Sequence, residues 1–155
     1  MKKAILVIGL VFAAITTIGF TSDDQDKVPQ VVKDAFAQKF PTAEKVDWDK
    51  ESATEWEGEF KMNTLEYSAN FLEDGTWKET EHKIDKAEIP QVVITALRSN
   101  FPGYEIEETE MAETPQGTVY EFEIEKGKTE MEVTIDPNGK VLKKQMEAEE
   151  ADDND

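Results

Sequence analysis

The sequence predicts an α+β protein in which two tandem helix-plus-four-strand repeats form one antiparallel sheet with both helices on one face. The first observation behind this prediction is an internal repeat, which aligns Val28–Pro41 with Ile89–Pro102 at a constant offset of 61 residues (28 to 89, 41 to 102). The second is that each copy opens with apolar residues at helical spacing. The third is that the apolar spacing then changes to two, which is typical of strands with one buried face and one wet face.

Each copy begins with a helix that carries one apolar stripe. The stripe recurs at every fourth residue in both copies: Val28, Val32, Phe36 and Phe40, then Ile89, Val93, Leu97 and Phe101. Pro29 and Pro90 suit the first helical turn, where the missing N–H costs nothing. Both helices should end at a Phe-Pro pair, because the residue before a proline is pushed out of the helical conformation.

After each helix, apolar and polar residues alternate through a series of strands. In the first copy Trp56, Phe60 and Tyr67 occupy apolar positions of this alternation, and Tyr120 does so in the second. Asp74-Gly75 and Asn138-Gly139, flanked by alternating residues, are strong hairpin signals. The sequence of each copy therefore predicts a helix followed by a meander of about four strands, and the helices should cover the apolar face of the sheet.

Two terminal segments differ from the repeats. Residues 1–22 combine two lysines with a short apolar run, and the acidic pair Asp23-Asp24 follows at once; this pattern predicts a secretory signal peptide, and a membrane anchor is the alternative. Residues 147–155 hold six acids and no bases, which predict a disordered acidic tail. Between these segments we expect the first repeat over residues 23–84 and the second over residues 85–146.

The composition excludes several kinds of chemistry. The 155 residues include no Cys and a single His, which removes disulfides, thiolate sites and any site that needs two imidazoles. A formal net charge of −18 argues against nucleic acid and anionic membranes as partners, and points to basic proteins, cations or simple solubility.

An acidic patch is expected on the wet face of the predicted hairpin in the second repeat. Its members are Glu121, Glu123, Glu130 and Glu132. A two-residue loop at Lys126-Gly127 would pair Glu123 with Glu130, and a four-residue loop over residues 126–129 would pair Glu123 with Glu132. Either register sets glutamate against glutamate, which is destabilising. In the first repeat the corresponding hairpin, turning near Asn63-Thr64, should set Lys61 against Glu66 and so relieve the repulsion.

This patch has three interpretations. It could bind a basic partner surface, or hold a hard cation such as Ca²⁺, which takes several oxygen ligands. The simpler interpretation is a solvated face that repels edge pairing and keeps an exported protein soluble. Trp48 and Trp77 are further candidates for partner contact, because tryptophan often anchors interfaces and both belong to strands near a sheet end. Packing in the core is the interpretation that we favour for the aromatic residues as a group.

Nothing in the chain predicts an enzyme. His82 is the lone imidazole and no Ser is placed to partner it. The many carboxylates include no pair in a recognisable pocket-forming context, and no glycine-rich phosphate loop or cluster of histidines occurs. We therefore expect no catalytic residues, no cofactor and no defined metal ligands.

The duplicated helix motif, [VI]-P-Q-V-V-x-x-A-[FL]-x-x-x-F-P, resembles the PepSY-like family, also described as beta-lactamase-inhibitor-like. Two tandem copies of this unit cover roughly Val28 to Met146. The resemblance implies an exported or periplasmic protein with two helix-plus-four-strand units on one curved sheet. It also implies binding or inhibition of another protein, although a fold does not by itself carry a function.

Together these observations predict a periplasmic or secreted, non-enzymatic module that binds an unidentified protein or peptide with a basic surface through its acidic sheet face. Inhibition of the partner is one form that this binding could take. No nucleic acid and no stable membrane anchor after signal cleavage are expected. The alternative is an envelope protein that binds Ca²⁺.

Overall fold

The computed structural model describes residues 27–146, so the predicted signal peptide and the acidic tail lie outside the described residues. The first half consists of α1 (Gln30–Lys39), β1 (Glu44–Ser52), β2 (Glu55–Met62), β3 (Leu65–Leu72) and β4 (Trp77–Lys83). The second half consists of α2 (Gln91–Asn100), β5 (Glu105–Thr114), β6 (Gly117–Lys126), β7 (Thr129–Ile135) and β8 (Val141–Met146). No helix within residues 27–146 is long and apolar enough to cross a membrane.

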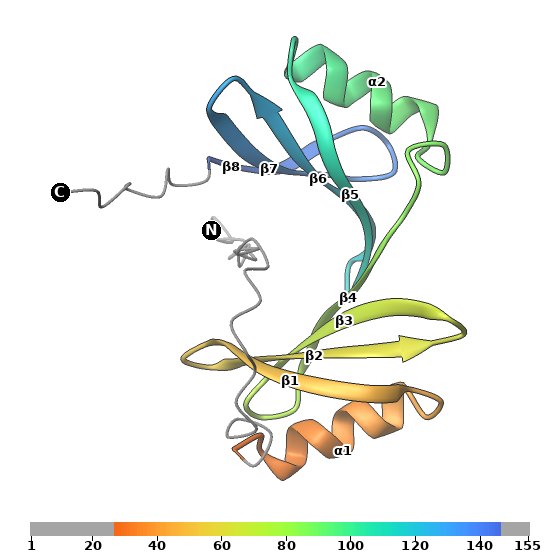
Figure 1. The fold of residues 1–155 in the computed structure, drawn as a ribbon, viewed down its shortest axis with the longest axis vertical. Helices are drawn as coiled ribbons and strands as arrows, with labels where there is room; N and C mark the ends of the chain where they lie inside the picture. The colour runs from red at the N-terminus through yellow and green to blue at the C-terminus, as the bar shows by residue number, and fades with distance from the viewer. Residues whose placement is uncertain (1–26, 147–155) are drawn as a thin grey trace, which may run out of the picture.

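The strands form a single eight-stranded sheet in the order β1 to β8, and each strand is antiparallel to the next. The predicted α+β class and the meander are confirmed. The sheet bends at β4 and β5, and both helices lie on its outer side (Figure 1). The two halves join where Thr80–Lys83 of β4 pairs with Glu110–Glu113 of β5, over four residue pairs against nine between β5 and β6.

Each helix covers its own half of the sheet, so the molecule has two hydrophobic cores. The first core contains the predicted stripe of α1 together with aromatic side chains from β1, β2 and β3: Trp48, Trp56, Phe60 and Phe71. The second contains the stripe of α2 with Phe122 and aliphatic side chains from β6 and β7: Ile124, Val133 and Ile135. Val32 and Val93 are both 0% exposed, which places the two stripes in equivalent buried positions.

Pro29 and Pro90 are the N-cap residues of their helices, one position before the first turn in which the sequence placed them. Pro29 and Pro90 immediately precede their helices, with extended backbone (ψ 139° in both), rather than belonging to the first turn. The carbonyl of Pro29 accepts bonds from the N–H groups of Val32 and Lys33, at 3.0 and 3.2 Å. Because a capping residue must offer its carbonyl but not its N–H, proline fits this position as well.

The hairpin glycines hold each meander against its helix. Gly75 and Gly139 adopt φ of +84° and +85°, a conformation that L side chains rarely reach. A Cβ at Gly75 would lie 3.0 Å from the carbonyl oxygen of Val31, and one at Gly139 would lie 3.1 Å from that of Val92. Glycine is therefore required both by the turn and by the close approach to the helix backbone.

Candidate acidic site on the inner face of the sheet

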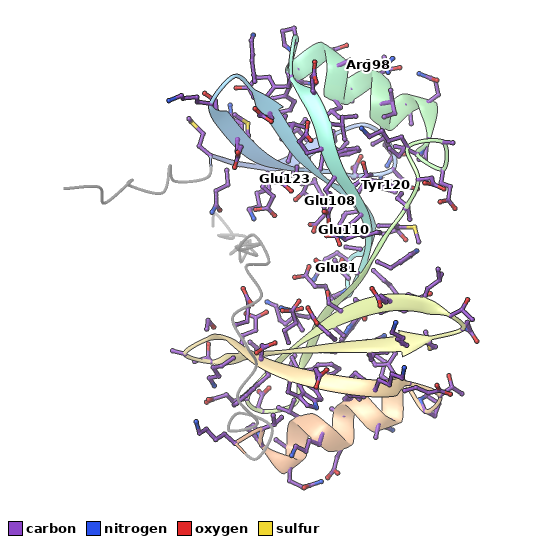
Figure 2. The ribbon with its side chains drawn as sticks, in the orientation of Figure 1. Glu81, Arg98, Glu108, Glu110, Tyr120 and Glu123 are labelled. Carbon is purple, nitrogen blue, oxygen red and sulfur yellow. The ribbon has the colours of Figure 1, made fainter. Side chains whose placement is uncertain are left out.

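The sheet face opposite the helices, called here the inner face, carries most of its charge as carboxylates. Alternation places one residue in two on this face, and the strand register aligns them in rows across the sheet. One row runs Glu57, Asn70 and Glu79 across β2, β3 and β4, and another runs Glu110, Glu121, Thr134 and Lys143 across β5 to β8. Glu81, Glu110, Glu108 and Glu123 follow one another along the inner side of the bend (Figure 2).

Three of these glutamates converge where the two halves meet. Glu79 and Glu81 of β4 and Glu121 of β6 each offer one carboxylate oxygen, and these oxygens all lie within 4.8 Å of one another. We call these three residues the glutamate triad. Ala112 of β5 lies directly opposite Glu81 and is 0% exposed. Its small side chain leaves room for Glu121 to reach across β5.

Burial and mutual repulsion dominate the electrostatics of the triad. Burial, followed by the charges of Glu121 and Glu79, raises the pKa of Glu81 to about 11. Burial and the charge of Glu121 raise the pKa of Glu79 to about 8, and burial also raises the pKa of Glu121. Lys143 acts in the opposite direction on both Glu79 and Glu121.

Two more carboxylates of the inner face titrate near neutrality. Burial raises the pKa of Glu57 to about 7, and the neighbouring acid Glu51 adds to the effect. Burial and the charge of Glu108 raise the pKa of Glu110 to about 7. The inner face therefore carries less negative charge at pH 7 than its number of acids suggests, and it gains charge when a cation approaches.

Two buried polar side chains of this face lack an ordinary hydrogen-bond donor. Glu81 is 1% exposed, and among the described residues no N–H or hydroxyl donor reaches its carboxylate oxygens; a proton on Glu81 can be shared only with the carboxylate of Glu121. Asn70 is 0% exposed and lies directly opposite Glu79, yet its side-chain oxygen and nitrogen are both unpartnered within the described part of the chain. Buried polar groups are nearly always satisfied, so such atoms need an explanation.

The structure spreads the acidic residues predicted from sequence over the second half of this face. Glu121 belongs to the triad, and Glu123 lies opposite Glu132. Glu130 lies further along the hairpin, opposite Glu125. Glu132 has a counter-ion, because Lys143 Nζ donates to its carboxylate at 2.9 Å.

The hairpin register decides between the two pairings that the sequence left open. Lys126 pairs with Thr129, so the turn is Gly127-Lys128 and Glu123 faces Glu132. The pairing of Glu123 with Glu130 is therefore wrong, because the turn sits one residue later than that register requires. In the first half Lys61 does lie opposite Glu66, with an ion pair of 2.6 Å, as the sequence predicted.

The two tryptophan candidates lie on the helix side of the sheet. Trp48 is 6% exposed and packs edge-on against Phe36, with ring centroids 5.2 Å apart. It lies opposite Gly58, where a Cβ would come within 3.1 Å of the indole ring, so the glycine makes room for it. The burial of Trp48 leaves no surface for partner contact.

Trp77 is half-buried against the first core. Its indole N–H donates to Thr80 Oγ1 at 2.9 Å, and the ammonium of Lys39 lies 3.5 Å from the ring centroid. It therefore lies beside α1 and away from the inner face.

Sequence reasoning correctly sets Asn70 against Glu57, but it does not identify Glu79, Glu81 or Asn70 as members of a site. Glu79 and Glu81 alternate along β4 and so share a face, but alternation alone does not place that strand beside the second repeat. The triad exists only because β4 pairs with β5, which brings Glu121 within reach.

The architecture defines a class of protein: a duplicated helix-on-meander unit whose acidic inner face spans both copies. The chain belongs to the family described as "Putative beta-lactamase-inhibitor-like, PepSY-like", whose family model matches residues 54–143. The resemblance seen in the doubled helix motif is thereby confirmed.

Solved structures share this fold at low sequence identity. A BLIP-like protein from Bacteroides fragilis is 20% identical with a TM-score of 0.66, over 85% of this chain and 97% of that one. A structure described as "putative periplasmic proteins" from Bacteroides eggerthii is 20% identical with a TM-score of 0.66, over 77% and 88%. A DUF2874 family protein from Bacteroides uniformis is 19% identical with a TM-score of 0.67, over 76% and 88%. A search of curated proteins found no match.

Proposed function

We propose that this chain is an exported, non-enzymatic module that binds a protein or peptide with a basic surface through the inner face of its sheet. The observation that carries the proposal is the concentration of carboxylates from both halves on one curved surface. Glu57, Glu110 and Glu123 stand on that surface together with the triad. Inhibition of the partner is part of the same proposal, supported by the family's inhibitor-like description, and so is a periplasmic or secreted location, supported by the description of a solved structure with this fold as periplasmic.

The electrostatics of the inner face favour a cationic partner. Burial raises the pKa of Glu57 and of Glu110 to about 7, so an approaching ammonium or guanidinium group would restore their ionised forms. Charge of one sign on a curved surface also steers a partner of opposite sign and raises its association rate. Such binding should weaken steeply as salt screens the charges.

The position of the single histidine supports a non-enzymatic role. The ring of His82 lies 5.0 Å from that of Tyr67. Tyr67 packs against the first core, so the imidazole is directed away from the carboxylates of the inner face. A general base paired with these carboxylates would have to face the same side of the sheet.

The test is a pull-down from envelope extract with two charge-matched triple variants. Glu108→Gln/Glu110→Gln/Glu123→Gln removes charge from the inner face and leaves the triad intact. The control changes three exposed acids away from the inner face: Asp34→Asn, Glu88→Gln and Glu113→Gln.

Wild type and the control should retain the same protein at low salt and release it as salt rises, whereas the inner-face variant should not retain it. Equal retention by the two triple variants would contradict the proposal, as would the absence of any retained protein at low salt.

A further inference from the structure

We propose that the glutamate triad, together with Asn70, forms a binding site for a divalent cation of the Ca²⁺ class at the junction of the two halves. This site differs from the acidic patch expected from sequence, with which it shares only Glu121. The proposal is independent of partner binding and stands on three features of the described residues: spacing, unpartnered buried atoms and a missing counter-ion.

The spacing of the triad suits one ion of this size. Ca²⁺ binds oxygen ligands at about 2.3–2.6 Å, so two ligands on opposite sides of the ion lie about 5 Å apart. The three carboxylate oxygens of Glu79, Glu81 and Glu121 lie within 4.8 Å of one another, so all can contact one ion. Mg²⁺ demands a tighter octahedron, and Zn²⁺ favours nitrogen and sulfur ligands, which this site does not offer.

Asn70 provides an independent indication that a ligand belongs here. Its side chain is 0% exposed, has no hydrogen-bond partner among residues 27–146, and lies directly opposite Glu79 on the same face. Side-chain amide oxygens are regular Ca²⁺ ligands beside carboxylates. A cation would satisfy the amide oxygen of Asn70 and the buried oxygens of Glu81 at once.

The row that contains Glu79 lacks a built-in counter-ion. In the second half, Lys143 occupies the position that corresponds to Glu79 and pairs with Glu132 at 2.9 Å. No base stands in the row of Glu57, Asn70 and Glu79, so an external cation can supply the positive charge that Lys143 provides in the second half.

A cation bound by the glutamate triad would connect the two halves of the molecule. Glu79 and Glu81 belong to β4 and Glu121 to β6, so an ion bound by all three spans β5, where the halves are joined by a short ladder. Because an ion that binds only the folded state stabilises it by mass action, binding should appear as a concentration-dependent rise in melting temperature.

The experiment is thermal unfolding of the chain at pH 8, after treatment with EDTA, during titration with CaCl₂. At 100 times its Kd, Ca²⁺ should raise the melting temperature by roughly 8 °C, and calorimetry should give one ion per chain. NaCl at matched ionic strength should produce a smaller rise. If NaCl reproduces the whole effect, screening explains it and the proposal is wrong.

Four variants locate the ion. Glu81→Gln should abolish the response to CaCl₂. Glu79→Gln changes a half-buried ligand and should also abolish the response, so it replaces Glu81→Gln if that variant fails to fold. Glu59→Gln removes an exposed carboxylate from the same face and should leave the response unchanged. Glu79→Lys should raise the melting temperature without Ca²⁺ and remove the response, because its ammonium takes the place of the ion. An unresponsive wild type, or an equal response in Glu81→Gln, would overturn the proposal.

Discussion

The two halves of this protein share a fold but fill their cores differently. In the first half Phe36 packs against an aromatic cluster, with its ring centroid 5.0 Å from Phe60, 5.1 Å from Phe40 and 5.2 Å from Trp48. Leu97 stands at the equivalent position of the second half, in a core that is mainly aliphatic. The comparison teaches that the helix-on-meander unit depends on the position of the apolar stripe and not on the type of side chain.

The two halves also differ in the polar and charged residues that they place on the inner face. Glu57, Asn70 and Glu79 in the first half correspond to Glu121, Thr134 and Lys143 in the second, each at an offset of 64 residues (57 to 121, 70 to 134, 79 to 143). In the second row Thr134 Oγ1 donates to Glu121 at 3.2 Å, and the ammonium of Lys143 acts to lower the pKa of Glu121. The first row has two acids, an unpartnered amide and no base. The two rows therefore have equivalent backbone positions but differ in charge, because only the row of the second half contains a lysine.

Truncating the central stripe residue of each helix should have the largest effect and tests the comparison of the cores. We expect Phe36→Ala to lower the free energy of unfolding by about 4 kcal/mol and Leu97→Ala by about 3 kcal/mol, since the lost ring leaves the larger cavity. Urea unfolding measures both values. Leu65→Ala, at a side chain that is 50% exposed, should cost less than about 1 kcal/mol. A greater loss for Leu97→Ala than for Phe36→Ala would show that the second core carries the fold.

Removing the built-in counter-ion of the second half should have an intermediate effect. Lys143→Gln leaves Glu132 without its ion pair and Glu121 with one positive neighbour fewer, in a pair whose side chains are only 11% and 17% exposed. We expect a loss of about 2 kcal/mol in the free energy of unfolding, measured in urea at pH 7. Lys144→Gln, one residue along at an exposed position, is the matched control. Equal losses in the two variants would mean that Lys143 balances no buried charge.

Much of the fold could be predicted from sequence because its signals are local. The repeated stripe places Val32 and Val93 at equivalent buried positions, and alternation in the first hairpin correctly sets Lys61 against Glu66. Trp48 could not be placed in the same way. Its burial depends on the glycine opposite it, Gly58, and therefore on the pairing of β1 with β2.

The candidate site could be predicted only in part because it depends on contact between repeats. The short match of Glu59-Phe60 with Glu121-Phe122 suggests an offset of 62 residues (59 to 121), but the register makes Glu57 the counterpart of Glu121. Longer strands in the second copy, 10 residues in both β5 and β6 against 9 in β1 and 8 in β2, shift the offset to 64 (57 to 121) and so conceal the correspondence between Glu79 and Lys143. The triad also needs the pairing of β4 with β5, which no periodicity encodes.

The smallest expected effect is a dependence of stability on pH that is opposite to the usual one. Burial raises the pKa of Glu57 and of Glu110 to about 7, so between pH 4.5 and 7 the folded chain holds protons that the unfolded chain has lost. Stability should therefore decrease as pH rises through this window, by on the order of 1 kcal/mol after solvent screening. Thermal unfolding in EDTA from pH 5 to pH 8 measures the change.

The opposite trend should begin at more acidic pH, where the turn aspartates titrate. Hydrogen bonds from Thr76 lower the pKa of Asp74, and those from the backbone N–H groups of Lys140 and Asn138 lower that of Asp136. Stability is then lost as pH falls through these lowered values, so the melting temperature should peak near pH 5. Glu57→Gln/Glu110→Gln should make the slope above that peak shallower, with the raised pKa values of Glu79 and Glu81 producing the remainder, whereas Glu113→Gln, at an exposed position, should preserve it. A melting temperature that climbs steadily to pH 8 would mean that the inner-face carboxylates are already ionised at pH 5, and that the charge difference between the halves costs the fold nothing.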